Sequence, residues 1–239
     1  MASTMNSKNL YIGNAYRDQN PNWHREDAQW KSAIISSLLK EYKIQPETIC
    51  ELGCGAGDVL RFLKASYPNS GLYGYDISPH AAKFWINSQG EGDNIFFTLG
   101  DFHQINTLSY DILMMLDVFE HVYNPFSFLE KTRKYAKKFI FHIPLDLSAF
   151  SVARKMPLLN AHRNVGHLHF YTKDLALEIL RDAGYKIIDW RYTGASLNSS
   201  ERSWKTKIAS IPRRLLWRIN RDMGVRLLGG ETLLVLAES

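Results

Sequence analysis

The segment Ile49-Cys-Glu-Leu-Gly-Cys-Gly-Ala-Gly-Asp58 decides the fold of this chain. It begins as a short apolar run, passes through three glycines, Gly53, Gly55 and Gly57, and continues into an amphipathic stretch from Val59 to Tyr67. This order predicts a strand, a tight turn and a helix. Glycine tolerates positive φ and lets the backbone approach a ligand closely, and the helix start offers unpaired N–H groups. We therefore expect a ligand at this turn.

The charges around the turn indicate which ligand it binds. A dinucleotide fingerprint, Gly-x-Gly-x-x-Gly counted from Gly53, would need a third glycine where the chain has Asp58. Glu51 lies two residues before the first glycine. Two carboxylates would repel a pyrophosphate, whereas a ligand with an ammonium and a sulfonium would favour them. The pattern therefore favours S-adenosylmethionine (SAM) over NAD.

Two further acids follow predicted strands. Asp76 ends the run that starts at Gly71, nineteen positions after Gly57, which suits hydrogen bonds from a ribose diol. Asp101 follows the apolar run Ile95–Leu99 and is placed to accept a hydrogen bond from an adenine amino group, with Phe102 beside the ring. Each aspartate could instead cap a helix or stabilise a turn.

Together, Glu51-x-Gly53-x-Gly55-x-Gly57, Asp76, Gly100-Asp101-Phe102 and Leu116-Asp-Val-Phe-Glu-His121 resemble class I SAM-dependent methyltransferases. The last run is similar to the small-molecule and quinone-type branch, and the resemblance covers about residues 23–192. It implies an α/β, Rossmann-like, seven-stranded, mostly parallel sheet with helices on both faces and an antiparallel last strand. The cofactor-binding residues that it implies are Glu51, Gly53, Cys54, Gly55, Gly57, Asp76, Ile77, Asp101, Phe102, Leu116, Asp117 and Val118.

Strand and helix patterns alternate from residue 47 onward, which predicts a mostly parallel sheet with ligands at the carboxyl ends of its strands. The expected strands are 48–52, 72–76, 95–99, 110–116, 139–143, 185–192 and 232–237; the expected helices are 30–42, 58–66, 79–88, 125–136 and 172–184. We divide the chain into an N-terminal arm and cap helix (1–44) and a SAM-binding methyltransferase domain (45–239). A basic helical insertion is expected at about 193–230, with a helix that begins at Pro212 and ends before Gly224.

Composition narrows the class of protein. The 239 residues are 45% hydrophobic, with no apolar run long enough to span a bilayer and no signal-peptide core at the start. The two cysteines, Cys50 and Cys54, flank the end of the first strand, where a buried strand residue and a cofactor-loop residue are expected rather than a disulfide or a metal pair. A cytoplasmic location is expected.

The net charge of +5 resides in one segment, because residues 201–226 hold eight basic and two acidic residues. This basic helix, at about 202–226, is interpreted either as a contact with an anionic membrane surface or acidic acceptor, or as a surface helix with a solvated basic face.

Histidines supply the candidates for chemistry on the acceptor. His121 is the candidate general base, since histidine titrates near neutral pH; a structural hydrogen bond in the turn is the alternative. His142, His167, His169 and Trp23 are candidate acceptor-pocket residues, although each is also explained by ordinary packing. Some quinone-type O-methyltransferases bind a divalent cation through an acid-x-x-Glu-His pattern, which Asp117, Glu120 and His121 match. Because metal-free relatives carry it too, no metal is predicted.

The function that this sequence favours is transfer of a methyl group from SAM to a small-molecule acceptor, which could be linked to a lipid or glycan, by in-line displacement. A nucleic-acid methyltransferase is the alternative that the pI of about 9.1 suggests. The fourth strand is followed by neither an Asn/Asp-Pro-Pro-Tyr motif nor a Pro-Cys nucleophile, so nucleic acid is not the favoured partner. A non-catalytic or NAD-type Rossmann protein is the third candidate. The acceptor and the oligomeric state are left unassigned.

Overall fold

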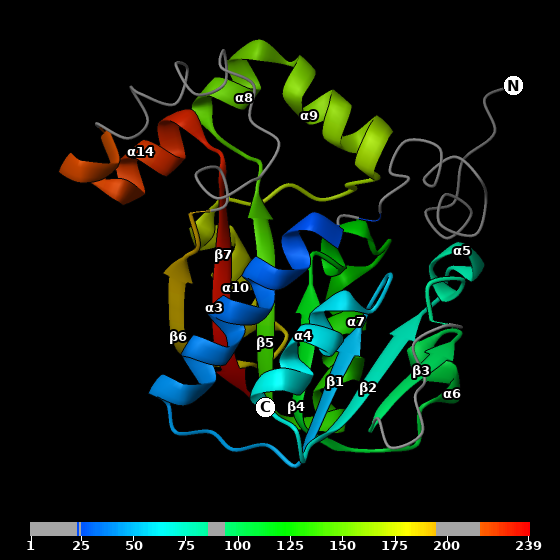
Figure 1. Ribbon diagram of the computed structural model, residues 1–239. Helices are drawn as coiled ribbons and strands as arrows, with labels where there is room; N and C mark the ends of the chain where they lie inside the picture. Colours follow the sequence, from blue (N-terminus) through cyan, green and yellow to red (C-terminus); the bar gives the residue numbers. More distant parts are fainter. Residues whose placement is uncertain (1–22, 24, 86–93, 195–215) are drawn as a thin grey trace, which may run out of the picture.

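The computed structural model describes residues 23, 25–85, 94–194 and 216–239. Its seven strands form one sheet in the order β3-β2-β1-β4-β5-β7-β6, and the first five strands are parallel (Figure 1). β7 lies between β5 and β6 and is antiparallel to both. The predicted fold class is therefore confirmed, including the antiparallel last strand. The strands are β1 Thr48–Leu52, β2 Gly71–Asp76, β3 Ile95–Leu99, β4 Tyr110–Leu116, β5 Ala136–Leu145, β6 Lys186–Tyr192 and β7 Glu231–Glu238.

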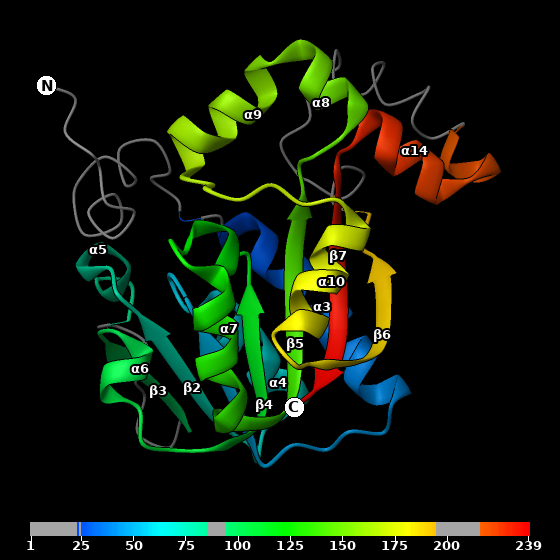
Figure 2. The ribbon, with the colours of Figure 1, turned by 180° about the vertical axis from the view of Figure 1, so that it is seen from behind.

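Helices cover both faces of this sheet. Helices α3 (Ala28–Glu41) and α4 (Asp58–Ser66) lie on the face toward the viewer in Figure 1, and α7 (Pro125–Thr132) and α10 (Lys173–Asp182) lie on the opposite face in Figure 2. Helices α8 (Ala149–Arg154), α9 (Met156–Asn160) and α14 (Arg221–Leu228) lie above the carboxyl end of β5. The shorter elements are η1 Arg25–Asp27, α5 Pro79–Ala82, α6 Phe102–Ile105, η2 Phe119–His121, η3 Arg133–Tyr135 and η4 Ala161–Val165.

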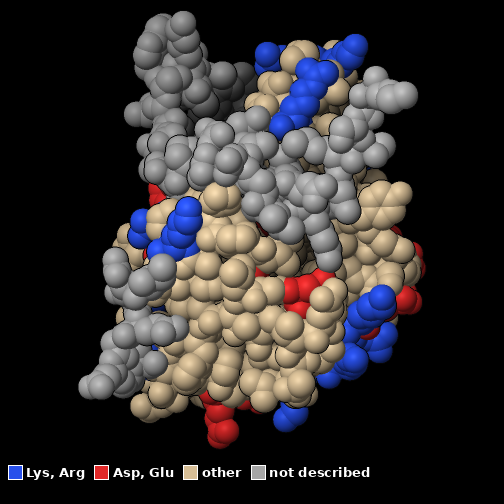
Figure 3. All heavy atoms as spheres, turned by 90° about the vertical axis from the view of Figure 1, so that its right-hand side faces the viewer, with Lys and Arg blue, Asp and Glu red and all other residues tan. Residues whose placement is uncertain are grey.

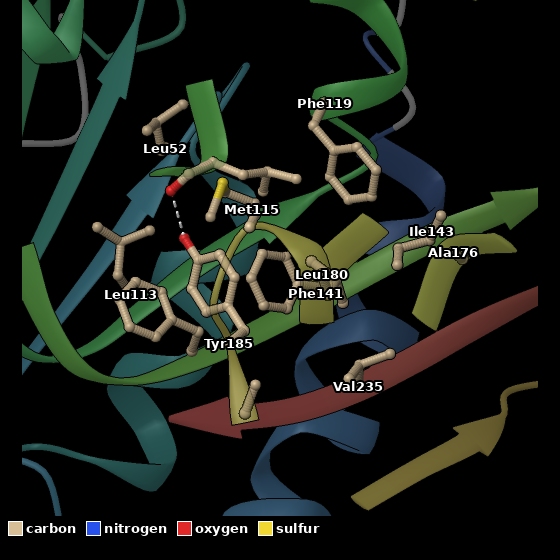
Figure 4. Packing of buried hydrophobic residues seen from close by; sticks show 14 of the residues in the cluster. Leu52, Leu113, Met115, Phe119, Phe141, Ile143, Ala176, Leu180, Tyr185 and Val235 are labelled. Atoms are coloured by element: carbon tan, nitrogen blue, oxygen red, sulfur yellow. Dashed lines mark hydrogen bonds between the residues drawn. The ribbon is translucent and has the colours of Figure 1, made fainter. Parts of the chain in front are cut away.

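The central strands are apolar on both faces, as expected when each face is covered by helices. Along β4, Leu113 and Met115 pack into the cluster with α7 and α10, and Ile112 and Met114 pack into the cluster with α3 and α4. Figure 4 shows the first cluster, in which the hydroxyl of Tyr185 donates a hydrogen bond of 2.8 Å to a backbone carbonyl of α7. Each large apolar side chain buried in this way contributes about 1.5–3 kcal/mol to folding.

Three predicted helix ends are wrong. Helix α5 ends at Ala82 rather than at Ser88, and residues 86–93 lie outside the described part. Helix α7 ends at Thr132, where a 3-10 turn follows before β5. The helix predicted to stop before Gly224 is interrupted at Asn220, whose side chain caps α14, and α14 continues through Gly224 to Leu228. The part of that prediction before residue 216 lies outside the described residues, as does the arm before residue 23.

Among the described residues, none of the helices combines the length and the apolar character that crossing a membrane requires.

Candidate functional site

The glycine turn after β1 has the geometry that the sequence predicted. Gly57 has φ of +81° at the N-cap of α4, and a Cβ there would lie 2.4 Å from the ring of Phe97. Gly55 has φ of +51°, and among the described residues a Cβ on it would meet only the ring of Trp23, at 3.8 Å. The backbone is therefore closely packed at Gly57 and open toward the cavity at Gly55.

A cavity of about 1420 Å³ lies over this turn and the carboxyl ends of β1, β2 and β4. Every predicted cofactor-binding residue lines it, as do His121, His142, His167 and Trp23. Among the described residues, His169 is not one that lines the cavity; Nε2 of its ring lies 3.0 Å from the backbone carbonyl of Val122. This bond ties the segment after η4 to the turn after β4, and the expected place of His169 in the acceptor pocket stays a prediction.

Glu51 places a buried carboxyl group at this end of the cavity. It is 3% exposed, and within the described part of the chain its Oε2 atom has no hydrogen-bond partner. Burial raises the pKa of Glu51 from 4.5 to about 8, Lys31 opposes the rise, and Asp76, Asp58 and Asp117 add to it. An unpaired carboxyl group inside a cavity lined by further acids suits a cationic group of a ligand.

The second acid expected at the turn, Asp58, contributes less to the attraction for a cationic ligand than its sequence position suggested. Its carboxylate pairs with Arg25 and, at 2.6 Å, with Arg61. The preference for a cationic ligand therefore rests mainly on Glu51. Figure 3 shows one side of the molecule, where acidic atoms lie in a recess among uncharged ones and basic side chains lie in separate groups around it.

Asp76 and Asp101 both line the cavity, and both also organise the backbone. The carboxylate of Asp76 accepts hydrogen bonds of 2.8 Å from the backbone N–H groups of Gly55 and Ser78, which joins the end of β2 to the glycine turn. Burial raises the pKa of Asp76, and these backbone hydrogen bonds oppose the rise. Asp101 caps α6 by accepting from the N–H of His103. The cap interpretation of Asp101 is thus correct, and its role toward adenine stays a prediction.

Phe102 is 3% exposed and packs edge-on against Tyr75, with ring centroids 5.0 Å apart. Its ring therefore belongs to the core, and its contact with a bound adenine stays a prediction.

A charged network joins four elements at the other wall of the cavity. Asp117 accepts from Lys31 of α3 and pairs with Nδ1 of His142 of β5, each at 2.7 Å. Nε2 of His142 lies 2.8 Å from the hydroxyl of Thr232 of β7. Burial alone would raise the pKa of Asp117, but His142 and Lys31 outweigh it and hold the pKa well below its usual range. Asp117 is therefore ionised and held in place, with φ of +55°.

Lys31 is the main residue of the site that the sequence interpretation missed. It lies on the face of α3 that also carries the buried Ile35 and Leu38, at helical spacing. A lysine within an otherwise apolar stripe was the available signal, because such a residue needs a buried partner. Thr232 offered no comparable signal.

A second polar cluster borders the cavity at the turn after β4. Glu120 is fully buried, His121 lies beside it with Nε2 3.8 Å from its carboxylate, and the rings of His121 and His167 lie 4.8 Å apart. Nδ1 of His167 is 2.5 Å from the carboxylate of Asp146. Burial, together with His167, lowers the pKa of His121 to about 4.

The cavity fits SAM on the chain's own features. The buried Glu51 oxygen without a partner suits a cationic group, the open face of Gly55 leaves room for a ligand against the backbone, and Asp76 has acceptor capacity left on both oxygens. A diphosphate would find fewer matching groups here, since Glu51, Asp76 and Asp101 are all acids.

Comparison with known proteins places this geometry in a family. Residues 23–189 match the model of a methyltransferase domain family. Magnesium protoporphyrin IX methyltransferase from Synechocystis, solved with bound SAM, has a similar structure: the TM-score is 0.62 at 15% identity, covering 100% of this chain and 99% of that one. The plantazolicin methyltransferase BpumL, solved with S-adenosylhomocysteine and a monoazolic desmethylPZN analogue, gives a TM-score of 0.63 at 14% identity, covering 98% of this chain and 93% of that one.

Human N-acetylserotonin methyltransferase in complex with SAM gives a TM-score of 0.62 at 15% identity, covering 100% of this chain and 60% of that one. A search of curated proteins finds no match to the sequence. The family match spans most of the chain and includes the glycine turn, the acids after β2 and β3, and the run after β4. The chain therefore belongs to the methyltransferase domain family and is a SAM-dependent methyltransferase.

Proposed function

We propose that this chain transfers the methyl group of SAM to a small-molecule acceptor that binds in the same cavity. One observation carries the proposal. A single cavity of about 1420 Å³ extends from the glycine turn to a wall formed by His121, His167 and Leu168. Sites for one small ligand are commonly about 300–1,000 Å³, so this volume accommodates an acceptor beside the cofactor.

SAM, when bound, supplies a methyl group on an activated leaving group. The chain's own task is then to align the acceptor and exclude water. The network of Lys31, Asp117, His142 and Thr232 serves that task, because it fixes one wall of the cavity through paired charges rather than mobile side chains. Trp30 packs edge-on against His142, with ring centroids 5.8 Å apart, and lines the same wall.

The role of His121 as a general base stays a prediction. A ring with a pKa of about 4 is neutral at physiological pH, but it is a weak base toward a hydroxyl group. Positioning, rather than proton removal by His121, therefore supports the proposed reaction best.

The surface formed by α8, α9 and α14 supports a lipid-linked acceptor, which the protein would reach at a membrane surface. Phe150, Val152 and Met156 on α8 and α9 are 45–58% exposed, and Met223 of α14, which contacts α8, is 56% exposed. Exposed apolar side chains grouped in this way suit insertion at an interface. The basic residues of α14 support the membrane contact less, because Arg221 pairs with Glu231 and Arg226 with Asp174.

Sedimentation with vesicles tests this form of the proposal. The protein should sediment with anionic phospholipid vesicles, and the Val152→Asp variant should remain in the supernatant. Equal sedimentation of the two proteins, or none by either, would remove the support for a lipid-linked acceptor and leave a water-soluble or glycan-linked one.

The reaction itself is tested with methyl-labelled SAM and a fractionated metabolite and lipid extract, followed by mass spectrometry of labelled products. The wild-type protein should label a discrete low-molecular-weight product. The Gly55→Arg variant, in which the new side chain enters the open face of the turn, should label none. Label found only in RNA, DNA or protein fractions would contradict a small-molecule acceptor.

A further inference from the structure

The turn after β4 contains a buried group that the proposed methyl transfer does not use. Glu120 is 0% exposed, and neither of its carboxylate oxygens has a hydrogen-bond partner within the described part of the chain. Burying a carboxyl group without partners is strongly unfavourable, so such a group is retained where it binds something. Glu120, His121 and His167 each offer one ligand atom, and these atoms lie within 4.8 Å of one another.

The surrounding groups hold both histidines in fixed orientations. Nδ1 of His167 is bonded to the carboxylate of Asp146, which leaves Nε2 as its ligand atom. The ring of His121 is hydrogen-bonded to the backbone of Gly166, and its Nε2 is the atom near Glu120. Metal-binding histidines commonly use their second ring nitrogen for such a bond to a carboxylate or a backbone carbonyl.

The backbone brings the two halves of the cluster together. The N–H groups of Leu168 and His169 donate to the backbone carbonyl of Glu120, at 2.9 and 3.1 Å. His162 is bonded through Nδ1 to the backbone carbonyl of His167, at 2.9 Å. The segment after η4 is therefore fastened to the turn after β4, so the three side chains are assembled by the fold before any ligand arrives.

We propose that Glu120, His121 and His167 form a binding site for a divalent transition-metal ion, with Zn²⁺ the best match. Two imidazoles and one carboxylate are a donor set that zinc accepts while keeping a coordination position open. Magnesium prefers an all-oxygen set and fits less well. A tetrahedral zinc ion with bonds of about 2.1 Å separates its ligand atoms by about 3.4 Å. The ligand atoms, which lie within 4.8 Å of one another, must therefore approach by up to about 1.4 Å. The carboxylate of Glu120, which has no hydrogen-bond partner within the described part of the chain, is the group that can move.

This site differs from the expectations drawn from sequence. No metal was expected, and the pattern that raised the question would have used Asp117 with Glu120 and His121. In the structure, the two carboxylate oxygens of Asp117 are already bonded, one to Lys31 and the other to His142. His167, which lies 46 positions beyond His121 in the chain, takes its place. His121 is then a ligand rather than a general base.

The position of the site suggests its use. His121 and His167 both line the cavity, so the open coordination position of the ion borders the space assigned to the acceptor. An acceptor with an oxygen donor, such as a hydroxyl or carboxylate, would bind there. This last step rests on the proposed function, whereas the ion site itself rests only on the arrangement of the three side chains.

The test measures metal binding directly and needs no methyl transfer. Chelator-treated, tag-free protein is titrated with ZnCl₂ by calorimetry, and the Co²⁺-loaded protein is examined by visible absorption. We expect one Zn²⁺ per chain and the intense d–d bands of a four-coordinate cobalt site. Glu120→Gln and His167→Ala should weaken Zn²⁺ binding at least about a hundredfold, and Asp146→Asn about ten- to a hundredfold. His103→Ala, which removes a histidine of the same cavity outside the cluster, should bind Zn²⁺ like the wild type.

Several outcomes would overturn the site. Absence of Zn²⁺ binding by the folded wild type would do so, and so would wild-type affinity in both Glu120→Gln and His167→Ala. Circular dichroism and SAM binding show whether each variant is folded. Glu120→Gln is the variant least expected to misfold, because glutamine has nearly the same volume as the buried glutamate. A protein that binds Zn²⁺ with this specificity but labels no small molecule would keep the ion site and refute the proposed acceptor.

Discussion

Replacing Glu51 by glutamine tests the electrostatics of the cofactor end of the cavity. Burial raises the pKa of this carboxyl from 4.5 to about 8, with Lys31 opposing and three nearby aspartates reinforcing the rise. Between those two values the folded protein holds a proton that the unfolded chain has released. The folded state therefore loses stability as pH rises from about 4.5 to about 8, and the loss stops above 8.

The magnitude follows from the size of the rise. The difference between 4.5 and about 8 corresponds to about 5 kcal/mol at roughly 1.4 kcal/mol per pH unit. Glutamine at this position has no such dependence. Between about pH 5 and pH 8, the wild type should lose about 4 kcal/mol of unfolding free energy relative to Glu51→Gln. Urea unfolding of both proteins, followed by circular dichroism at several pH values, measures this difference.

Proton release on SAM binding gives a second test of the Glu51 carboxyl. The ammonium and sulfonium of SAM favour ionised Glu51, so binding to the wild type should release protons near neutral pH, and binding to Glu51→Gln should not. Calorimetry in two buffers of different ionisation enthalpy reports the number of protons released. Parallel stability curves for the two proteins, together with equal proton release, would refute the argument that this buried carboxyl determines the preference for a cationic ligand.

Substitutions at three other positions test other parts of the site and the fold. Gly55→Arg should fold and lose SAM binding in calorimetry, whereas Gly55→Ala, whose methyl group would make an ordinary contact with the ring of Trp23, should lose at most part of it. Binding of SAM by the arginine variant would show that the cofactor does not lie against Gly55. Lys31→Met should leave Asp117 with His142 but without its lysine partner, lower the unfolding free energy by about 2–4 kcal/mol and move acid unfolding to higher pH, whereas Lys31→Arg should change little. Tyr185→Phe should cost about 1 kcal/mol in urea unfolding, because it removes one of the two hydrogen bonds that the carbonyl of Leu129 accepts, the other coming from the backbone N–H of Arg133. An unchanged stability would contradict the bond from Tyr185.

Local patterns predicted the parts of the fold that depend on neighbouring residues. The bounds of β1, β3, β4 and α4 agree with the sequence prediction, because an apolar run next to a glycine turn or a polar break marks them within a few residues. Helix ends were less predictable. Asn220 ends one helical stretch and caps the next, whereas the expected stop, Gly224, lies inside α14. A glycine predicts a helix end only when no stronger capping residue precedes it.

The candidate site was predictable where one strand end carries one functional residue, as for Glu51 and Asp76. Contacts between distant segments were not. Lys31 pairs with Asp117, which lies 86 positions later in the chain. Because of this ion pair, Asp117 is a fixed part of the cavity wall rather than a possible metal ligand. Asp146 supports His167 from a connector with no regular pattern. Such pairs depend on how the helices and strands pack together, which the local patterns of a single sequence do not predict.

The most direct test of the central claim is calorimetry of the wild-type protein with S-adenosylhomocysteine, alone and in the presence of excess NAD. The account predicts one binding site per chain, unaffected by NAD, because the cavity is lined with acids that suit a cationic ligand. An absence of binding by the folded protein, or displacement of the ligand by NAD, would contradict it.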